Sequence, residues 1–364
     1  MGDKLHLFVS ITGHGWGHVA QTAPILHGLR RKLPDLRLSI RSSIHEEFLR
    51  SRIHLDFNYI FSVDDFGILM KSPFEVDVQK TADAYSQLHA NWERHLDQIG
   101  KVFSASPPDL VLTNVGYADL AATARHGIPS ITMSCLNWAD LYHHYCAAEP
   151  EADLIHSQIL SAYNSAQHFL QAVPTMPMEN IRERREIGVI ADIGINQRSQ
   201  LNTRFGLCAN EKLVLVSLGG MPYEVNIEQW PRDQGIRWII PTEWQARHPD
   251  TIDFDSIGMS FVDVLTSCDV LVGKPGYGSF AAAACNGVPV LYVERPDWPE
   301  QPYLIQWLSR TGRCRRVSWE KLKCGDLESD IEALRSDPCP TPPLPEGVDN
   351  AVKIISRHLI DRTP

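Results

Sequence analysis

The sequence lacks the features that mark disulfide-rich, zinc-stabilised and membrane-spanning proteins. None of its eight cysteines belongs to a C-x-x-C pair, and several fall in stretches with the pattern of strands or helices. We therefore expect free thiols in a reducing, cytoplasmic compartment, without a disulfide framework or a metal site. No apolar run is long enough to cross a membrane, because Asn286, Gly287 and Pro289 interrupt the longest candidate. The N-terminal segment MGDKLHLFVSI has no long apolar core, so we do not expect a signal peptide.

Positive charge is also scarce. The 364 residues contain 34 lysines and arginines against 44 aspartates and glutamates, which gives a formal net charge of −10. A chain with this balance is not expected to bind nucleic acid or an anionic membrane surface broadly. Any phosphate site must then be local and built largely from backbone groups. Hydrophobic residues make up 43% of the chain, so it can bury the cores of two or three domains.

The apolar pattern predicts an α/β protein in which strands and helices alternate. The stretch from His6 to Ile11 predicts a strand, residues 19–32 have helical spacing, and residues 36–40 predict the next strand. A second cycle starts with a strand over 212–217. We expect two facing Rossmann-like, doubly wound domains whose glycine turns lie at the carboxyl ends of strands and line one cleft. The predicted divisions are an N-terminal domain over 1–175, a linker over 176–210, a C-terminal domain over 211–345, and a C-terminal helix within 346–364 that is a candidate to pack back on the N-terminal domain.

The first glycine turn, residues 12–18, contains two histidines. A histidine at the start of a helix has its pKa lowered by the positive end of the helix dipole, which favours the neutral imidazole that can accept a proton. His18 is therefore the first candidate for a general base and His14 the second; the alternative for each is a turn histidine bonded to backbone. A carboxylate usually orients such a base. Asp140 follows a strand end and is the candidate, whereas we interpret Asp119 as an ordinary helix-surface residue.

The same turn also matches a dinucleotide-binding fingerprint. The residues from Gly15 to Ala20 fit G-x-G-x-x-A, and Arg41 rather than an acidic residue ends the second predicted strand. That combination suits the 2′-phosphate of NADP, so an NADP-dependent reductase is an alternative function. The neighbouring pair His143 and His144 does not predict a metal site, because adjacent residues on a helix point about 100° apart.

A second glycine turn follows the strand predicted over 270–272. Gly276 and Gly278 allow close approach of backbone to a ligand, and Ser279 is predicted to cap a helix over 281–284. The N–H groups of such a helix start favour an anion, most often a phosphate. The alternative is that the glycines serve only the turn.

A polar loop closes this region. Glu300 and Gln301 follow the next strand, in a loop rich in proline and tryptophan. Carboxylate and amide side chains accept from and donate to vicinal hydroxyl groups, which is the chemistry of holding a sugar. The alternative is a solvated surface loop.

Together these motifs resemble the two-domain nucleotide-sugar glycosyltransferases of the GT-B fold. The pair Gly17 and His18 is similar to the glycine–histidine turn of plant-type UDP-glycosyltransferases and of the peptidoglycan N-acetylglucosaminyltransferase. A narrower resemblance is to the glycosyltransferase-like N-terminal half of plant L-arabinokinases and related bacterial proteins, over nearly the whole chain. No sugar-kinase domain follows in these 364 residues, so kinase activity is not expected. The segments that carry the resemblance are Thr12–Gly15, Gly17–His18, Asn137–Asp140, Leu218–Gly220, Gly273–Gly278 and Pro299–Tyr303.

The resemblance implies an inverting, metal-independent hexosyl- or related transferase. It implies a nucleotide-diphosphate sugar such as a UDP-sugar as donor substrate, an acceptor hydroxyl that loses its proton to His18, and no cofactor. The donor base, its sugar, the acceptor and the oligomeric state are left open. The resemblance assigns the following residues to the donor: Gly15, Gly17, Gly219, Gly220, Lys274, Gly276, Tyr277, Gly278, Ser279, Glu300 and Gln301.

Two positions depart from the pattern of that family. Asn114 stands where many plant-type enzymes have the carboxylate that orients the histidine, and Gly276 or Tyr277 stands where they have a phosphate-binding histidine. These departures motivate a third reading, a non-catalytic protein that binds or senses a nucleotide sugar.

Overall fold

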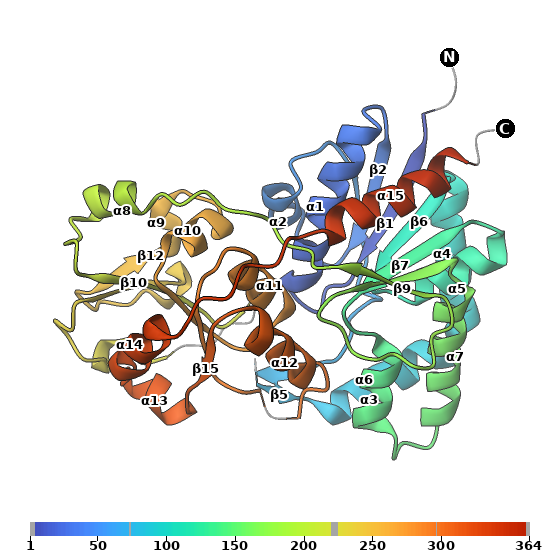
Figure 1. Cartoon of the computed structure of the whole chain (residues 1–364). Helices are drawn as coiled ribbons and strands as arrows, with labels where there is room; N and C mark the ends of the chain where they lie inside the picture. The colour runs from blue at the N-terminus through green and yellow to red at the C-terminus, as the bar shows by residue number, and fades with distance from the viewer. Residues whose placement is uncertain (1–3, 73, 220–224, 296, 362–364) are drawn as a thin grey trace. The chain divides into compact units, whose positions relative to one another are not determined.

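A computed structural model describes residues 4–72, 74–219, 225–295 and 297–361, and its helices and strands are drawn in Figure 1. Among these residues the chain forms two compact units, each built on a parallel sheet. The first unit takes the described residues of Met1–Lys71, Glu75–Ile190 and Glu346–Pro364, and the second those of Ser72–Phe74 and Ala191–Pro345. Residues 176–210, for which the sequence suggests a linker, contain a strand of the first unit and a helix of the second.

The first unit is organised around a parallel sheet with the strand order β3-β2-β1-β6-β7-β8-β9. Its central strand pairs on both sides, with Leu7 opposite Leu38 on one side and opposite Leu110 on the other. Both faces of a central parallel strand are covered, which is why this strand is an unbroken buried run and does not alternate. The strands are β1 (His6–Ile11), β2 (Arg37–Ser42), β3 (Asn58–Phe61), β6 (Leu110–Asn114), β7 (Ser130–Ser134), β8 (His168–Ala172) and β9 (Arg184–Gly188), with β4 (Met70–Ser72) and β5 (Glu75–Val76) forming a small separate sheet.

The strand order decides which helices cover which face of this sheet. From β1 the chain moves outward to β2 and β3, then crosses back and moves the other way through β6, β7 and β8. Right-handed crossovers therefore place α1 and α2 on one face and α4 and α5 on the opposite face. The helices are α1 (Trp16–Lys32), α2 (Glu46–Arg52), α3 (Val78–Ala90), α4 (Trp92–Ala105), α5 (Ala118–His126), α6 (Trp138–Cys146), α7 (Ala152–Ser165) and α15 (Gly347–Ile360).

The C-terminal helix α15 belongs to the first unit, where it packs on α1 and β9. A Cβ atom at Gly28 of α1 would lie 2.6 Å from Cγ2 of Val352, so the two helices approach closely at that glycine. Asn350 Nδ2 donates a hydrogen bond of 3.0 Å to the carbonyl of Ile187 in β9. The last helix thus completes the first unit although residues 191–345 of the second unit intervene in the sequence.

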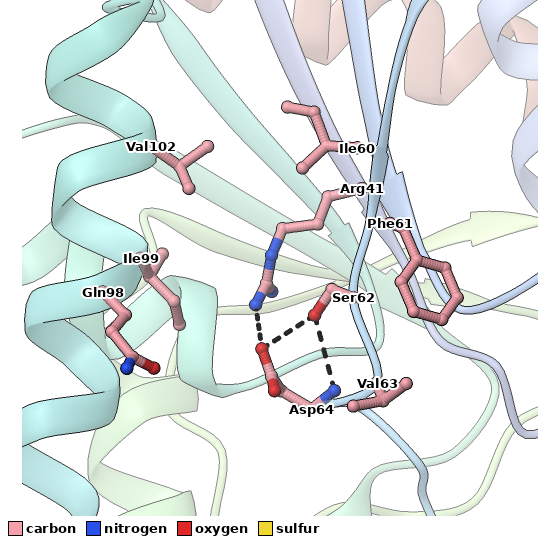
Figure 2. A pocket seen from close by; sticks show the side chains of 9 residues that line it. All are labelled: Arg41, Ile60, Phe61, Ser62, Val63, Asp64, Gln98, Ile99 and Val102. Atoms are coloured by element: carbon pink, nitrogen blue, oxygen red, sulfur yellow. Dashed lines mark hydrogen bonds and ion pairs between the residues drawn. The ribbon is translucent and has the colours of Figure 1, made fainter.

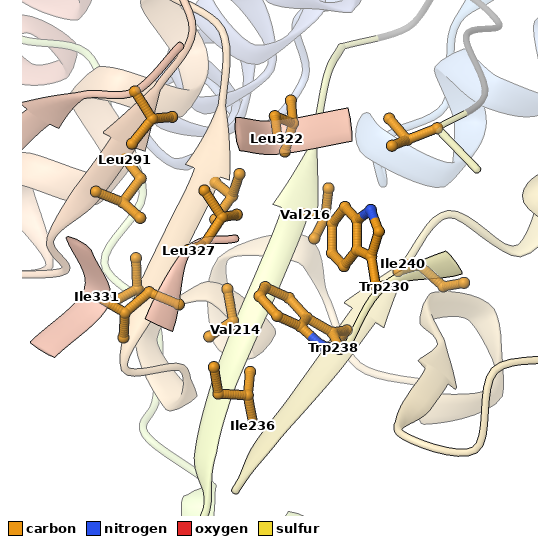
Figure 3. Close-up of a cluster of buried hydrophobic side chains, with 14 of the residues drawn as sticks. Val214, Val216, Trp230, Ile236, Trp238, Ile240, Leu291, Leu322, Leu327 and Ile331 are labelled. Atoms are coloured by element: carbon orange, nitrogen blue, oxygen red, sulfur yellow. The ribbon is translucent and has the colours of Figure 1, made fainter. Parts of the chain in front are cut away.

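The second unit has a parallel sheet with the order β12-β11-β10-β13-β14-β15. Figure 3 shows the cluster of buried apolar side chains on one face of it, where Trp230 and Trp238 meet edge to face with centroids 4.7 Å apart. Gly325 has a φ of +68° and its Cβ would lie 2.4 Å from Trp230, so this close approach requires glycine. The strands are β10 (Lys212–Ser217), β11 (Ile236–Ile240), β12 (Thr251–Asp253), β13 (Val270–Gly273), β14 (Val290–Tyr292) and β15 (Cys314–Arg316).

The helices of the second unit include two short 3₁₀ segments. They are α8 (Arg198–Phe205), η1 (Ile227–Gln229), η2 (Thr242–Trp244), α9 (Phe254–Ile257), α10 (Phe261–Ser267), α11 (Tyr277–Cys285), α12 (Gln301–Thr311), α13 (Trp319–Cys324) and α14 (Glu328–Ser336). In the described parts of both units, no helix combines the length and hydropathy that a transmembrane span requires.

Two helices begin earlier than the sequence predicts. Helix α1 starts at Trp16 instead of residue 19, and α11 starts at Tyr277 instead of residue 281. The cap of α11 is Gly276, so the prediction of Ser279 as its cap is wrong. Glycine caps a helix with backbone geometry alone, without the side-chain oxygen on which the prediction depended. His18 and Ser279 consequently lie inside first helical turns.

Candidate functional site

His18 is held in the first turn of α1, where it is only 6% exposed. Its Nδ1 lies 2.9 Å from Oδ1 of Asn114, the last residue of β6. Burial lowers the pKa of His18 to about 4, and the hydrogen bond to Asn114 raises it by a smaller amount. The imidazole is therefore neutral at pH 7.

Asn114 decides which nitrogen of His18 carries the proton. Its Nδ2 faces three acceptors, which are the carbonyl of His18 at 3.2 Å, Oε1 of Gln21 at 3.1 Å and Oγ1 of Thr22 at 3.0 Å. This set turns the amide so that Oδ1, which can only accept, faces His18. Nδ1 must then be the N–H donor, and Nε2 carries the lone pair. Nε2 has no hydrogen-bond partner among the described residues, so it is the atom that can take a proton.

The structure does not place Asp140 against His18. Asp140 lies in the first turn of α6, where its N–H donates to Asn137 Oδ1 at 2.8 Å and its carboxylate accepts from Asn137 Nδ2 at 2.7 Å. This reciprocal pair caps the helix. The residue that orients His18 is Asn114, which supplies geometry without the negative charge of a carboxylate.

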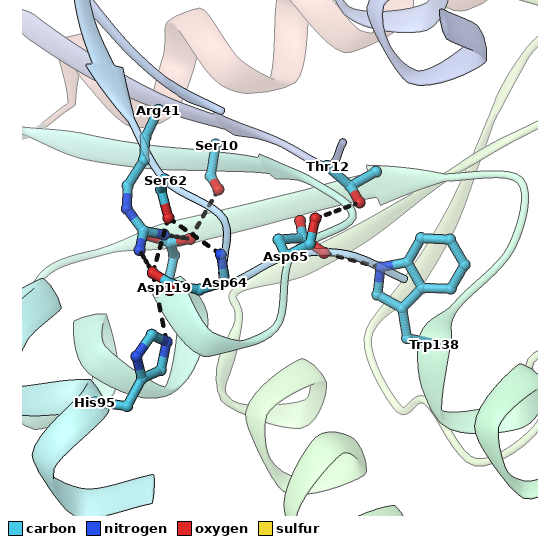
Figure 4. A network of polar contacts seen from close by, with 9 residues as sticks. All are labelled: Ser10, Thr12, Arg41, Ser62, Asp64, Asp65, His95, Asp119 and Trp138. Atoms are coloured by element: carbon cyan, nitrogen blue, oxygen red, sulfur yellow. Dashed lines mark hydrogen bonds and ion pairs between the residues drawn. The ribbon is translucent and has the colours of Figure 1, made fainter. Parts of the chain in front are cut away.

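Asp119 is 1% exposed, so its interpretation as a helix-surface residue is wrong. Figure 4 shows its carboxylate accepting from Ser10 Oγ at 2.7 Å and from Arg41 Nη1 at 2.9 Å. The other terminal nitrogen of Arg41 is paired with Asp64. Arg41 is the cation on which the reading as an NADP-dependent reductase rested, and its two carboxylate partners already engage both terminal nitrogens.

Trp138 is packed beside both histidines of the first turn. Its ring centroid lies 5.1 Å from that of His14 and 5.8 Å from that of His18. Its Nε1 donates to Oδ1 of Asp65 at 3.2 Å, as Figure 4 shows. Gly67, at a φ of +64°, lies so close that a Cβ there would be 2.6 Å from the Trp138 ring. His14 is thus brought into the same cluster as His18.

Asp65 holds this turn in place, although no sequence pattern singles it out. Its backbone carbonyl accepts from the N–H of Gly13 at 3.1 Å and from Oγ1 of Thr12 at 3.2 Å. Burial raises the pKa of its carboxyl to about 7, and the charge of Asp119 acts in the same direction. The surrounding segment is polar and irregular, and none of its local patterns marks an anchor.

Gly15 and Gly17 leave open space at the start of α1. A Cβ atom at either position would meet nothing within 4 Å. Packing within the unit therefore does not require glycine at these positions. Their lack of side chains instead leaves the first N–H groups of α1 accessible, and the first turn of this helix has no acidic residue to occupy them.

The second glycine turn joins β13 to α11 in the second unit. Gly273 pairs with Ser217 so closely that a Cβ there would lie 2.6 Å from the Ser217 carbonyl oxygen. Gly276 caps α11, and Tyr277, Gly278 and Ser279 form its first turn, which has no acidic residue. The N–H groups of this turn have no intrahelical acceptors, so the helix start favours an anion.

Lys274 precedes Gly276 in the second glycine turn, and its side chain lies beside Gly219, which follows β10. A Cβ atom at Gly219, whose φ is +92°, would lie 2.9 Å from Cε of Lys274. Burial lowers the pKa of Lys274 to about 7, and Arg295 lowers it further while Glu300 raises it. The structure therefore brings together Gly219, Lys274 and Glu300, which are far apart in the sequence. Gly220, the other predicted residue of this segment, lies outside the described residues.

The predicted sugar-holding pair is fixed by its neighbours. Glu300 is 5% exposed, and its Oε2 accepts from Trp298 Nε1 at 3.0 Å. Gln301 Oε1 accepts from the backbone N–H of Arg295, whose guanidinium lies 3.5 Å above the Trp298 ring. The alternative of a solvated surface loop is therefore wrong for Glu300. Arg295 and Trp298 complete the cluster around Glu300 and Gln301. From the sequence, this loop was expected only to gather polar residues.

The described parts of the chain contain no group of three or more histidine, cysteine, aspartate or glutamate residues placed to hold a metal ion. His143 instead packs against His156, with ring centroids 4.7 Å apart.

Known structures share the fold that carries the residues around His18 in the first unit and those around Lys274 and Glu300 in the second. Spinosyn forosaminyltransferase SpnP superimposes with a TM-score of 0.62 at 15% identity, covering 100% of this chain and 96% of its own. Arabidopsis thaliana UGT89C1 complexed with UDP does so with a TM-score of 0.58 at 11% identity, covering 98% and 100%. This chain has the GT-B fold of glycosyltransferases. A putative UDP-N-acetylglucosamine 2-epimerase of Listeria monocytogenes, with a TM-score of 0.57, 12% identity and coverage of 99% and 97%, shares it.

A curated relative of this GT-B protein is a considerably longer chain. L-arabinokinase of Arabidopsis thaliana is 21% identical over an alignment of 316 residues that covers 82% of this chain but only 29% of that protein. No family model matches the chain. These similarities support the fold of the chain. They do not assign a reaction to its residues.

Proposed function

We propose that this GT-B protein is an inverting glycosyltransferase, which moves a sugar from a nucleotide diphosphate to an acceptor hydroxyl. The observation that carries the proposal is the neutral imidazole of His18, oriented by Asn114 with Nε2 left to accept a proton. A buried histidine fixed in this tautomer at a helix start is the arrangement that a general base for a hydroxyl needs.

In the proposed reaction, Nε2 of His18 takes the proton of the acceptor hydroxyl as the oxygen attacks the anomeric carbon. The new bond forms between that oxygen and the anomeric carbon. The bond from the anomeric carbon to the diphosphate breaks, and its electron pair leaves on the diphosphate oxygen. Attack from the face opposite the leaving group inverts the anomeric configuration.

The second unit supplies the groups for the donor in this proposal. Lys274 and the first turn of α11 stabilise the negative charge that develops on the leaving diphosphate. Glu300 and Gln301 hold hydroxyl groups of the donor sugar, and Gly219, which has no side chain, leaves room for phosphate oxygens. The reaction needs no metal and no cofactor besides the donor substrate, because these cationic and N–H groups serve the leaving group.

Solved relatives suggest which donors to test first. UGT89C1 is complexed with UDP, and the glycosyltransferase VinC is in complex with dTDP. UDP- and dTDP-sugars are therefore the first donors to test. The curated relative is named for L-arabinose, so that free sugar belongs among the acceptors.

A second candidate function is a non-catalytic protein that binds a nucleotide sugar. The observation that favours it is the amide of Asn114, which gives the imidazolium of His18 no compensating charge and leaves the pKa of His18 at about 4. A base this weak accepts a proton from a hydroxyl less readily than one with a pKa near 7.

One experiment separates these functions. UDP- and dTDP-sugars are screened for thermal stabilisation, with NADPH as comparison, and each donor that binds is then tested for transfer to a panel of sugar and small-molecule acceptors. A ligand at 100 times its dissociation constant adds about 2.7 kcal/mol of stability. Transfer with inversion supports the first function, and binding without transfer supports the second. Stabilisation by NADPH alone would contradict both.

A further inference from the structure

The first unit has an open pocket on the face of its sheet opposite α1. Its volume is about 300 Å³, and it lies between α4 and the edge formed by β2 and β3. Figure 2 shows Gln98, Ile99 and Val102 of α4 on one side, facing Arg41 and Ile60 on the other. None of these residues takes part in the His18 cluster. The pocket has a size within the range of small-molecule sites.

The walls of the pocket combine apolar and polar surface. Ile60, Ile99 and Val102 supply aliphatic side chains on both sides. Ser62 and Asp64 supply a hydroxyl and a carboxylate at one end, where Ser62 Oγ donates to Asp64 Oδ2 at 2.7 Å. A ligand that fits both kinds of wall needs an apolar face and several hydrogen-bonding groups around its edge.

Arg41 adds a buried donor to this pocket. It is 5% exposed, and its terminal nitrogens are engaged by Asp119 and Asp64. Its Nε has no acceptor among the described residues, although the side chain lines the pocket. Because the Arg41 side chain lines the pocket and its bonds to Asp119 and Asp64 use only the terminal nitrogens, a ligand oxygen in the pocket can accept from Nε.

The charges at the pocket select against an anionic occupant. One guanidinium faces two carboxylates, those of Asp64 and Asp119, so this cluster is negative overall. His95, whose Nε2 lies 3.8 Å from Asp64, adds no positive charge at pH 7, because burial lowers its pKa. A phosphate or carboxylate would therefore be repelled, whereas a neutral ligand would not.

We propose that this pocket binds a neutral, polyhydroxylated ring of the size of a monosaccharide or an inositol. The C–H groups on the two faces of such a ring pack on Ile60 on one side and on Ile99 and Val102 on the other. Its hydroxyl groups accept from Arg41 Nε and donate to the carboxylate of Asp64, and the amide of Gln98 does both. The site lies on the other face of the sheet from α1 and does not depend on the proposed transferase activity.

Titration calorimetry of the intact chain tests the proposal with D-glucose, D-xylose and myo-inositol, each compared with glucose 6-phosphate. We expect saturable binding of at least one neutral compound and weaker or no binding of the phosphate ester. Val102→Phe should abolish that binding, because the larger ring fills the pocket. Lys101→Phe places the same side chain at the neighbouring exposed position of α4 and should leave binding unchanged.

The thermal unfolding of both variants shows whether they fold. If Val102→Phe unfolds, Gln98→Leu replaces it as the test, because it removes only the amide from the wall and should weaken binding at least about tenfold. The proposal is overturned if none of the neutral compounds binds, if glucose 6-phosphate binds more tightly than glucose, or if the pocket variant that folds binds as well as the parent.

Discussion

Each unit places a glycine turn between a buried parallel strand and a helix, and the two turns are equipped for different chemistry. Both helices have a glycine cap, Gly15 for α1 and Gly276 for α11, and neither has an acidic residue in its first turn. The first turn carries His18, whose hydrogen-bond partner is the neutral Asn114. The second is flanked by Lys274, close to Arg295 and Glu300.

Under the proposed function, one backbone arrangement serves two purposes. A strand–turn–helix unit presents N–H groups at a helix start whatever its side chains are. In the proposed function, the side chains then decide which turn moves a proton and which holds an anion. In the first turn burial keeps His18 neutral, and in the second burial brings the pKa of Lys274 near 7, so that a phosphate bound there would determine its charge.

The largest effect is expected from His18→Ala, which tests the proton-transfer half of the comparison. Loss of a general base should lower the rate of sugar transfer by a factor of about 10²–10⁴, while the affinity for UDP stays the same. Steady-state kinetics and UDP titration measure the two quantities. His14→Ala is the matched control, since His14 packs on the same Trp138, and it should cost less. Full turnover in His18→Ala would show that His18 is not the base.

The next largest effect is expected from Lys274→Met, which tests the anion-binding half. Loss of a charged hydrogen bond to diphosphate should weaken UDP binding about 10- to 100-fold, which is about 1.4–2.8 kcal/mol. Lys323→Met, at an exposed position of α13, is the control and should change nothing. Unchanged affinity in Lys274→Met would place the diphosphate elsewhere.

The same lysine predicts how UDP binding depends on pH. In the free protein Lys274 loses its proton as the pH rises through about 7, because burial lowers its pKa. A bound diphosphate favours the charged form, so the complex keeps the proton to higher pH. UDP binding should therefore take up close to one proton at pH 8 and almost none at pH 6. Calorimetry in buffers of different ionisation enthalpy measures this uptake, and equal uptake at both values would contradict the assignment.

Asn114→Asp tests whether the lack of a negative charge beside His18 is what distinguishes the first turn from the second. The new carboxylate should raise the pKa of His18 by about 1–3 units, because it stabilises the imidazolium. Since His18 acts as the neutral form, the acid limb of the kcat/KM profile should move from about pH 4 to higher pH by that amount. Asn137→Asp makes the same chemical change at a helix cap and should leave the limb in place. An unchanged limb in Asn114→Asp would mean that another group controls the profile.

The smallest effect is expected from Asp65→Asn, which concerns only the anchor of the first turn. The pKa of Asp65 is raised in the folded protein from 3.8 to about 7, so the folded state keeps a proton that the unfolded state releases between these values. This contribution to stability is complete below pH 4 and is lost as the pH rises through about 7. Urea unfolding should show the parent losing stability over that range relative to Asp65→Asn. Parallel curves would show that the carboxyl titrates normally.

Much of the framework was predictable because it follows from local patterns. Continuous apolar runs such as His6–Ile11 predict buried parallel strands, and glycines after them predict strand-to-helix turns. The prediction of His18 rests on such a turn, because the residue stands inside it, whereas Lys274 was suggested only by the family resemblance. The starts of α1 and α11 were misplaced because a glycine cap gives no side-chain signal.

What the sequence determined by itself is the two cycles of strand, glycine turn and helix, and the residues that these turns carry. Only the tertiary structure decided which distant residues complete each turn. Asn114 lies 96 positions from His18 in the chain, and Asp65 reaches Gly13 from a polar segment without regular pattern. These contacts form between neighbouring strands and loops of a packed sheet. Their geometry depends on strand order and register, which no local spacing of residue types records.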